Sequence, residues 1–375
     1  MMKRHVVHIL VCAVILTVPL PARAQTNRNV PHSFREEIFV LGMGGAYTAG
    51  AWRGSGLFYN PASLAYKRFH LNVPLRLEVG GIGGITQAQE IIDFYKANEE
   101  KLRNIASQSP AQVTALDDQA RALDGTGGVA RVFPAVRLGW RNFGFQTYAS
   151  FNGVPQIDSG VFQPRVDLNG YSDIGVIAGY SRPFYYRTRR LDIRWYGGVA
   201  VKVFGRWGVN HGFTLTEATQ GYEFYNEVIN AVDDTPEYGV GADIGLLIPL
   251  TRDRSASIGV VAQDAITYGQ VRPEMSINVG GHWRILPRVN LVADYRDILN
   301  TSDTHWPMHL HFGGEFDLTM LRLRAGAYQG YPTLGMGVNL WLLKVDVVYY
   351  SQERGERLGH LTEKNIALEL QVGLD

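Results

Sequence analysis

Alternation of apolar and polar residues with a period of two runs through most of this chain. Residues 69–80 place leucines and valines on one face and His70, Arg76 and Glu78 on the other. A strand with two such different faces has one face in an apolar environment and one in a polar environment. Thirteen further segments read in the same way, so the sequence predicts an all-β protein of about 14 strands. They are 129–140, 143–153, 170–182, 193–206, 237–250, 255–266, 272–285, 288–299, 306–318, 321–329, 332–341, 343–351 and 362–374.

The connections between these segments alternate in length. Short connections fall at 141–142, 251–254, 286–287 and 319–320, and most long connections fall in the other gaps, such as 81–128, 154–169 and 207–236. A transmembrane antiparallel β-barrel has short turns at one end and long loops at the other. A soluble antiparallel sandwich would also contain alternating strands, but it does not require this asymmetry of connections. The pattern favours the membrane barrel.

Residues 1–24 are typical of a secretory signal peptide. Lys3 and Arg4 precede an apolar run, and Ala22-Arg23-Ala24 is typical of a cleavage site, so we expect a mature chain that starts at Gln25. The only cysteine, Cys12, lies inside this segment, which leaves no disulfide in the mature chain. No later apolar run reaches 18 residues. An exported chain with this pattern is predicted to lie in the bacterial outer membrane, in contact with its lipid.

The stretch Leu41–Ala46, continued by Gly56–Leu64, fits neither a strand nor a long helix. Its apolar residues do not alternate, and its glycines disfavour a helix while permitting close approach of one backbone to another. The step Asn60-Pro61 marks a turn. We expect this stretch to plug the barrel.

Residues 86–124 interrupt the strand pattern with apolar residues at helical spacing, and Ser109-Pro110 separates two expected helices. This insert after the first strand is either a loop that covers part of the barrel or a docking element for a protein partner. The long connection 207–236 is a second candidate for such docking. The near-neutral charge of +1 gives no reason to expect nucleic acid as a partner.

The polar face of the predicted strands carries charges of both signs. Enclosed charges are costly unless they pair, so these residues form either a network that joins plug and wall or a passage that receives a ligand's polar group. The candidates are Arg76, Glu78, Glu274, His282, Arg284, Asp294, Arg296, His309, His311, Glu315, Arg322 and Arg324.

Nothing in the sequence indicates catalysis or a cofactor. His309 and His311 share one face of a predicted strand with Glu315, which zinc would accept as ligands, but neighbouring positions on one strand do not define a metal site. No serine-hydrolase, metalloprotease or phosphate-binding motif is present. We therefore expect neither an enzyme, nor a metal site, nor a cofactor.

The pieces LGMGGAYTAG, GLFYNPASLA, VADYRDIL, LHFGGEF and LRAGAYQGYPTLGMGV resemble the FadL-like family of outer-membrane transporters, including its spirochaete, TraF-like and PorV-like branch. The resemblance implies a plug over residues 25–67 with an Asn-Pro-Ala box, followed by a fourteen-stranded barrel over 68–375. It indicates Asn60, Pro61 and Ala62, with Gly44 and Gly45, as residues that hold or gate the plug. The terminal Leu374-Asp375 departs from the aromatic end common among such barrels.

The resemblance also implies a function. Members take up hydrophobic or amphipathic small molecules such as long-chain fatty acids by passive passage, so a hydrophobic ligand is the expected partner. The alternative is an assembly or interaction barrel of a secretion or conjugation system, as in the PorV-like and TraF-like proteins, with no transport role.

Overall fold

A computed structural model describes residues 37–52, 56–66, 69–104, 107–158, 165–187, 192–214 and 235–374. The expected signal peptide, the first residues of the expected plug and most of the 207–236 connection lie outside these ranges.

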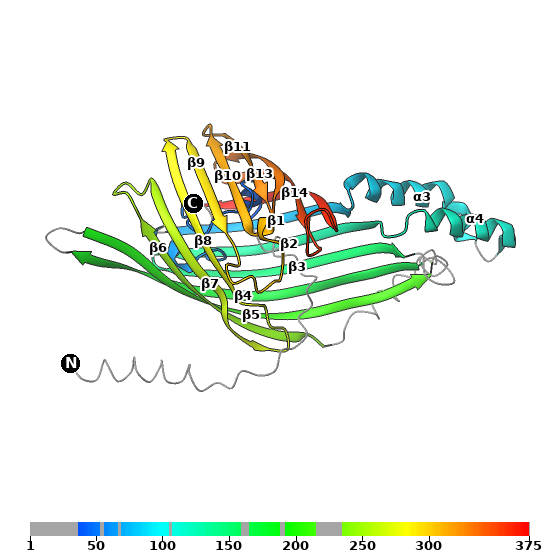
Figure 1. Ribbon diagram of the computed structural model, residues 1–375, viewed down its shortest axis with the longest axis horizontal. Coiled ribbons are helices and arrows are strands. Elements are labelled where there is room, and N and C mark those ends of the chain that lie inside the picture. The colour runs from blue at the N-terminus through cyan, green and yellow to red at the C-terminus, as the bar shows by residue number, and fades with distance from the viewer. Residues whose placement is uncertain are drawn as a thin grey trace.

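Fourteen strands in the described residues form a closed antiparallel barrel, in which each strand pairs with its neighbours in sequence and β1 closes against β14 (Figure 1). This confirms the predicted all-β barrel. The strands are β1 Phe69–Ile82, β2 Gly127–Trp140, β3 Phe143–Asp158, β4 Arg165–Arg187, β5 Asp192–Thr214, β6 Glu237–Pro249, β7 Ala256–Gly269, β8 Ser276–Leu286, β9 Val289–Tyr295, β10 Leu310–Asp317, β11 Leu321–Tyr328, β12 Tyr331–Leu340, β13 Leu343–Glu353 and β14 Thr362–Leu374.

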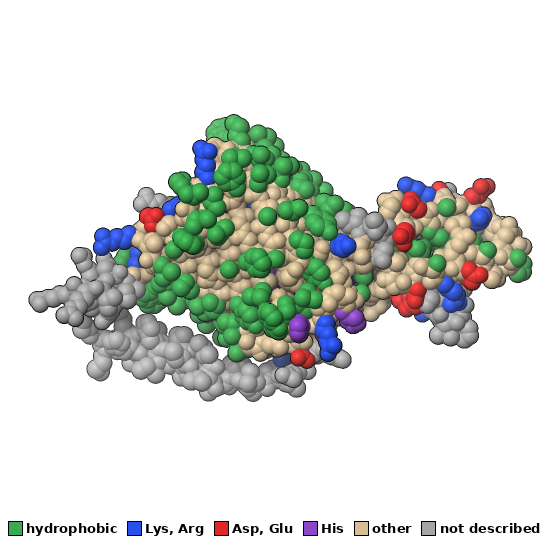
Figure 2. Space-filling model, turned by 45° about the horizontal axis from the view of Figure 1, so that its top comes forward, with side chains coloured by type: hydrophobic (Ala, Val, Ile, Leu, Met, Phe, Trp, Pro, Cys, Tyr) green, Lys and Arg blue, Asp and Glu red, His purple; other side chains and the backbone are tan. Residues whose placement is uncertain are grey.

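The outer wall of the barrel is apolar and the inner wall is largely polar. On β1, Leu71, Val73 and Val79 point outward and are 39, 49 and 62% exposed, whereas Arg76 and Glu78 point inward and are buried. Hydrophobic side chains spread over the barrel surface in Figure 2. Water-soluble proteins rarely expose continuous apolar surface on this scale, so the barrel spans a membrane with its outer wall against lipid.

Helices of the described residues lie at one end of the barrel and inside it. None of these helices has both the length and the apolar character needed to cross a membrane. The helical insert forms α3 (Ile85–Arg103) and α4 (Pro110–Arg121), which project beyond the barrel at the right of Figure 1. Ser109 caps α4 by exchanging hydrogen bonds with Gln112, and Pro110 occupies the first turn. The predicted helix break at Ser109-Pro110 is thus the start of α4.

The short turns gather at the opposite end of the barrel from this insert. They join β2 to β3, β6 to β7, β8 to β9, β10 to β11 and β12 to β13, and the β4–β5 hairpin extends at the same end, at the left of Figure 1. We call this the short-turn end and the end with α3 and α4 the long-loop end.

The N-terminal plug lies inside the barrel. Its described residues, 37–52 and 56–66, contain the one-turn helix α2 (Ile38–Gly42) and the 3-10 helix η2 (Pro61–Tyr66). Most of their side chains are buried, and α2 contacts β11 to β14 while η2 contacts β3 to β6. The barrel therefore closes around a short, irregular segment that precedes it in the chain.

Several predicted strand boundaries were wrong. Residues 306–309 form a 3-10 helix, η4 (Trp306–His309), because Pro307 lacks the N–H that a strand ladder needs, and β10 begins only at Leu310. Strand β8 begins at Ser276 rather than at 272. Strands β4 and β5 are 23 residues each, longer than their predicted segments, because their pairing continues outside the clearly alternating part.

The plug touches the wall backbone to backbone through glycine. Gly44 has φ +73°, and a Cβ there would lie 2.4 Å from the carbonyl oxygens of both Phe312 and Ala327. A Cβ on Gly313 would lie 2.6 Å from the carbonyl oxygen of Met43. Only glycine combines this dihedral angle with this approach.

We predict that Gly44→Ala destabilises the folded barrel by about 3 kcal/mol, because the substituent meets two carbonyl oxygens that belong to paired strands. The loss of stability is measured as the denaturant concentration at which half of the compact, heat-modifiable gel band disappears. Gly281→Ala is the control, since a Cβ there has no atom within 4 Å. Equal midpoints for the two variants would contradict the prediction.

Candidate functional site

The interface between the plug and the inner wall is the candidate functional site, and Asp294 is its strongest polar contact. Oδ2 of this β9 carboxylate accepts hydrogen bonds from the backbone N–H groups of Tyr47 at 2.8 Å and Thr48 at 2.9 Å, and from the Thr48 hydroxyl at 2.8 Å. All three residues are buried. A single wall side chain thus satisfies two backbone donors that the irregular plug cannot pair internally.

Asn60 joins two parts of the plug to strand β6. Its side-chain amide donates to the carbonyl oxygens of Thr48 at 2.9 Å and Leu246 of β6 at 3.0 Å. Its side-chain oxygen accepts the N–H of Ala62 at 3.0 Å, at the start of η2. The Asn60-Pro61-Ala62 box therefore organises the local turn and also anchors it to the wall.

Further wall side chains hold the turn that follows α2. Nδ1 of His311 donates to the carbonyl oxygen of Gly44 at 2.8 Å, and Arg296 donates to the carbonyl oxygen of Gly45. The Thr333 hydroxyl donates to the Gly42 carbonyl at 3.1 Å and accepts the Gly44 N–H at 3.2 Å. Gly44 and Gly45 are consequently held from β10, from β12 and from the residue that follows β9.

Aromatic side chains fill the centre of the plug. The Tyr47 ring lies 5.3 Å from Phe39, 4.8 Å from Trp52 and 5.3 Å from Tyr59, measured between ring centroids. Trp52 stacks on His282 of β8 at 4.3 Å, with an interplanar angle of 20°. These contacts make the plug a small core of its own, fastened to the wall at its edge.

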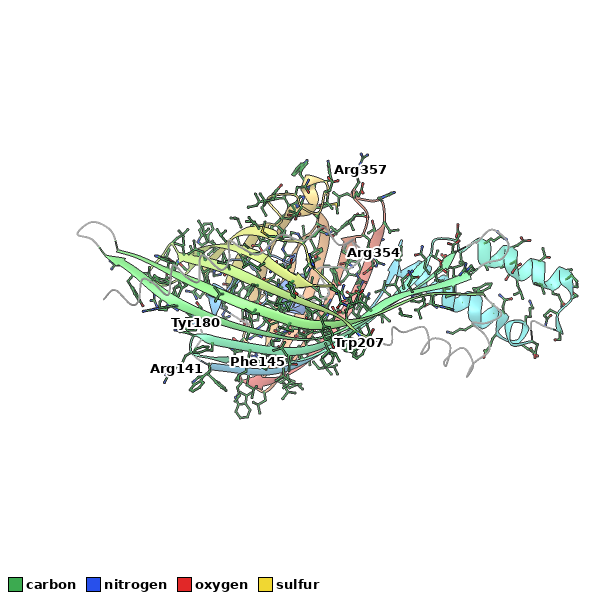
Figure 3. The ribbon with its side chains drawn as sticks, turned by 90° about the horizontal axis from the view of Figure 1, so that it is seen from below. Arg141, Phe145, Tyr180, Trp207, Arg354 and Arg357 are labelled. Atoms are coloured by element: carbon green, nitrogen blue, oxygen red, sulfur yellow. The ribbon has the colours of Figure 1, made fainter. Side chains whose placement is uncertain are left out.

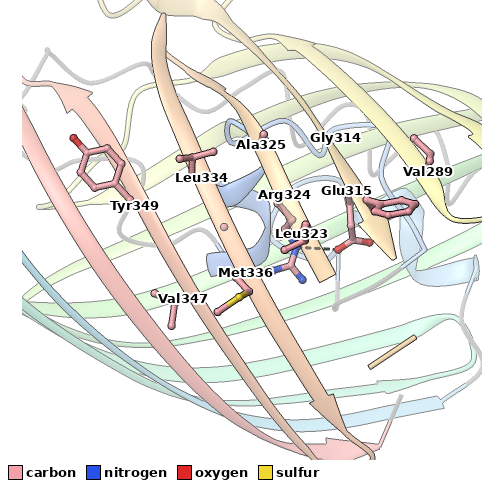
Figure 4. A pocket seen from close by; sticks show the side chains of 12 residues that line it. Val289, Gly314, Glu315, Leu323, Arg324, Ala325, Leu334, Met336, Val347 and Tyr349 are labelled. Atoms are coloured by element: carbon pink, nitrogen blue, oxygen red, sulfur yellow. Dashed lines mark hydrogen bonds and ion pairs between the residues drawn. The ribbon is translucent and has the colours of Figure 1, made fainter. Parts of the chain in front are cut away.

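An ion-pair cluster lies beside α2. The Arg324 guanidinium on β11 donates to Glu315 of β10 at 2.8 Å and also pairs with Asp346 of β13. It lies 5.7 Å from the Phe39 ring of the plug. Outside this cluster, on the lipid side, Leu323, Leu334 and neighbouring side chains line an open apolar groove of about 830 Å³ (Figure 4).

A second charged network crosses the lumen on the long-loop side of the plug. Glu78 pairs with Arg76 and Arg131 and accepts the Tyr350 hydroxyl at 2.7 Å. Arg131 also forms two hydrogen bonds with Glu363, at 2.7 and 3.0 Å. The side chains are almost completely buried, so the two arginines and two glutamates neutralise one another.

One part of the inner wall is apolar. Phe133 and Ala135 on β2, Tyr148 on β3 and Ile177 on β4 pack against one another and against Leu57 of the plug. All are buried although they face the lumen. Barrel interiors are ordinarily polar, so an inward apolar surface that meets the plug is the feature most suited to a hydrophobic ligand.

The loop after β9 is held by an acid outside the membrane-spanning strands. The Asp297 carboxylate accepts hydrogen bonds from the N–H and hydroxyl groups of Thr301 and Ser302, at 2.7 to 3.0 Å. Burial by itself would raise the pKa of Asp297, but these hydrogen bonds outweigh it and lower that pKa below its ordinary value. The stabilisation of this loop by the ionised Asp297 carboxylate is fully present above the ordinary pKa of aspartate. It is lost as the pH falls through the lowered pKa.

The structure buries most of the predicted lumen residues but separates them into the sets described above. The buried ones are Arg76, Glu78, His282, Asp294, His309, His311, Glu315 and Arg324. Arg296 and Arg322 are partly buried, and Arg322 pairs with Asp317 at 3.4 Å. His309 lies in η4 and bonds to the Arg296 carbonyl at 2.9 Å. Among the described residues, no group of His, Cys, Asp and Glu side chains is arranged to hold a metal ion.

Two predicted lumen residues do not belong to the buried networks. Glu274 is exposed, since β8 begins two residues later and the alternation was extended too far. Arg284 is exposed at the short-turn end, where it lies 3.7 Å from Asp253 in the β6–β7 turn. Arg284 lies on the same face of β8 as the inward-facing His282, as predicted, but this end of β8 extends beyond the enclosed lumen.

Several network members were missing from the predicted set. Arg131, Glu363, Tyr350 and Asp346 each carry an ion pair or hydrogen bond described above. Alternation along β2, β13 and β14 places them on the inward face, so that signal was available. What the sequence lacked was the register that brings Glu78 opposite Arg131.

Comparison with known proteins shows similarity at the level of fold. No protein-family model and no curated protein matches the sequence. Among solved structures, the toluene transporter TbuX of Ralstonia pickettii is 12% identical, with 92% of this chain and 99% of that chain covered and a TM-score of 0.48. The monoaromatic hydrocarbon channel CymD is 12% identical, covering 90% and 96%, with a TM-score of 0.46. The toluene transporter TodX of Pseudomonas putida is 10% identical, covering 89% and 96%, with a TM-score of 0.44. These channels are of the FadL family, which the sequence motifs resemble.

We predict that Asp294→Ala loosens the plug while the barrel remains folded. The change leaves three buried donors without their acceptor, at a cost of about 1–3 kcal/mol for each unsatisfied group. Planar-bilayer recordings should show a higher or more variable conductance, and limited proteolysis should cut the plug. Asp253→Ala, in an exposed turn, is the control. Identical conductance and cleavage in both variants would count against the anchoring role of Asp294.

We also predict that Glu363→Gln lowers barrel stability by about 3 kcal/mol, because it removes one carboxylate from a buried network and leaves positive charge uncompensated. The concentration of guanidinium chloride at which half of the compact gel band is lost gives the change in stability. Glu356→Gln, on an exposed loop residue, should leave the midpoint unaltered. A network without energetic importance would give the same midpoint in both variants.

Proposed function

We propose that the chain is an outer-membrane channel for passive uptake of hydrophobic or amphipathic small molecules, with the plug as its gate. The observation that carries this proposal is the inward apolar surface of Phe133, Tyr148 and Ile177 against Leu57 of the plug. A barrel that served only for polar solutes or as a scaffold would have no need of such a surface in its lumen.

The arrangement of charges supports an amphipathic rather than a purely apolar ligand. Arg131 and Phe133 are both inward-facing residues of β2, so the guanidinium network and the apolar surface are neighbours along one strand. A molecule with a polar end and an apolar body would contact both. Long-chain fatty acids fit this description, and so do smaller aromatic compounds with one polar group.

Gating would proceed by rearrangement of the plug, since the wall holds it through separate side-chain contacts and not through a continuous ladder. Asn60, Pro61 and Ala62 organise one part of the plug, and Gly44 and Gly45 lie in another that β10 and β12 hold. Loss of either set would release a different part of the plug.

A second candidate function is that of an assembly barrel, and the projection of α3 and α4 beyond the rim favours it (Figure 1). A partner protein could dock on this hairpin. Deletion of 86–124 would then abolish capture of the partner and leave ligand uptake intact, whereas a pure channel would show no partner to lose.

We predict that Phe133→Ser weakens binding of a hydrophobic probe by about tenfold or more, because it removes one large apolar side chain from the contact surface. Phe133→Leu, which keeps the surface apolar, should bind almost normally. Displacement of a fluorescent fatty acid from the purified barrel by oleate and by toluene gives the affinity and separates the two ligand classes. Absence of binding by the unaltered protein would overturn the proposed function.

A further inference from the structure

The short-turn end of the barrel carries a ring of exposed arginines. We call Arg141, Arg182, Arg252, Arg284 and Arg288 the arginine rim, since each lies in or beside one of the short connections and is exposed. Figure 2 shows blue basic side chains at this end of the molecule, opposite the helical insert.

Most of the rim has no acidic partner. Within the described residues, Arg141, Arg182, Arg252 and Arg288 form no ion pair, and Arg284 lies 3.7 Å from Asp253. Asp253 and the partly buried Asp317 are the only described acidic side chains at this end that are not buried. The rim therefore presents an excess of positive charge to whatever lies beside it.

Aromatic side chains accompany the arginines and set their depth in the membrane. The Arg141 guanidinium lies 5.7 Å from the Trp140 ring, and the Arg182 guanidinium lies 6.0 Å from the Phe184 ring. Trp140 is 63% exposed and Trp341, in the β12–β13 turn, is 83% exposed. Such aromatic residues sit at the level of lipid headgroups, and the arginines beside them occupy the same level.

Arg182 points toward lipid rather than toward the lumen. It lies on the same face of β4 as Tyr180 and Phe184, which are exposed on the outer wall, whereas Ser181, on the other face, is completely buried. Figure 3 shows Arg141 and Tyr180 near one end of the barrel, with Arg357 away from them. At least part of the rim thus faces the headgroup layer directly.

The helical insert at the opposite end has the reverse charge. The helical insert contains Glu90, Asp93, Glu99, Glu100, Asp117, Asp118 and Asp124 against Lys96, Lys101, Arg103 and Arg121. The arginine excess is consequently a property of one end and not of the whole surface.

We propose that the arginine rim binds the phosphate groups of anionic phospholipids in the leaflet next to the short turns. The planar guanidinium donates two parallel hydrogen bonds to phosphate, and basic side chains beside a membrane attract anionic headgroups. The partner is a phospholipid such as phosphatidylglycerol, because the rim lies at headgroup depth and part of it faces lipid. This inference rests on the barrel spanning a membrane and does not depend on the proposed transport.

The test uses the full barrel in bilayers of phosphatidylcholine that contain brominated phosphatidylglycerol. Tryptophan quenching against lipid composition gives the preference for phosphatidylglycerol, since exposed tryptophans lie at the rim. The triple variant Arg141→Gln, Arg182→Gln, Arg288→Gln should lose that preference by about fivefold or more, the effect expected of even one arginine near a charged surface. The triple variant Lys96→Gln, Lys101→Gln, Arg357→Gln removes equal charge away from the rim and should keep it.

The heat-modifiable gel band establishes that each variant is folded. An unchanged preference in the rim variant overturns the proposal and leaves the rim to an acidic protein partner. A second arm titrates the detergent-solubilised protein with inorganic phosphate. Saturable phosphate binding that the rim variant loses, without any lipid preference in bilayers, would assign the rim to a free phosphate group and would likewise overturn the lipid assignment.

Discussion

The backbone of the plug depends on the barrel wall for its hydrogen bonds. Residues 37–52 and 56–66 contain one turn of α2 and the short η2, so many of their backbone groups have no partner within the plug. Asp294, His311 and Thr333 supply those partners from three strands. Since a buried backbone group without a partner costs as much as a lost hydrogen bond, the plug has this conformation only inside this wall.

The lumen consists of two kinds of surface with different physical roles. The Glu78–Arg131–Glu363 network and the Arg324 cluster are rigid, because moving any member would leave a buried charge uncompensated. The surface around Phe133 and Tyr148 is held by non-directional contacts with Leu57, which can be exchanged for contacts with a ligand at little cost. Polar contacts also hold the plug on the β2–β4 side, where Arg137 of β2 pairs with Glu37 and Ser181 of β4 donates to the Ala62 carbonyl, so only the Leu57 contacts there are free of directional bonds.

Alternation predicted the barrel well because a strand between lipid and lumen must change character at every residue. It failed where that constraint ends. Glu274 and Arg284 follow the predicted alternation, but Glu274 precedes β8 and Arg284 lies near its exposed end. At Pro307 the predicted start of a strand is instead the 3-10 helix η4. The pairing of Glu78 with Arg131 depends on register across two strands separated by the helical insert, which periodicity along one strand does not contain. Asn60 was identified by its turn chemistry, yet its contact with Leu246 required the folded structure.

The closure of the barrel by β1 and β14 has a consequence for assembly. The plug precedes β1 in the chain, and β1 pairs with the last strand, so Leu71 and Leu374 become neighbours only when the cylinder closes. A segment wider than a single extended chain cannot be threaded into a finished cylinder whose ends are occupied by turns and loops. A sheet that still lacks the β1–β14 pairing is open along that seam, so the plug can reach β9 to β12 there without passing through either end of the barrel. The seam between the first and last strands is thus the natural point of entry for the enclosed segment.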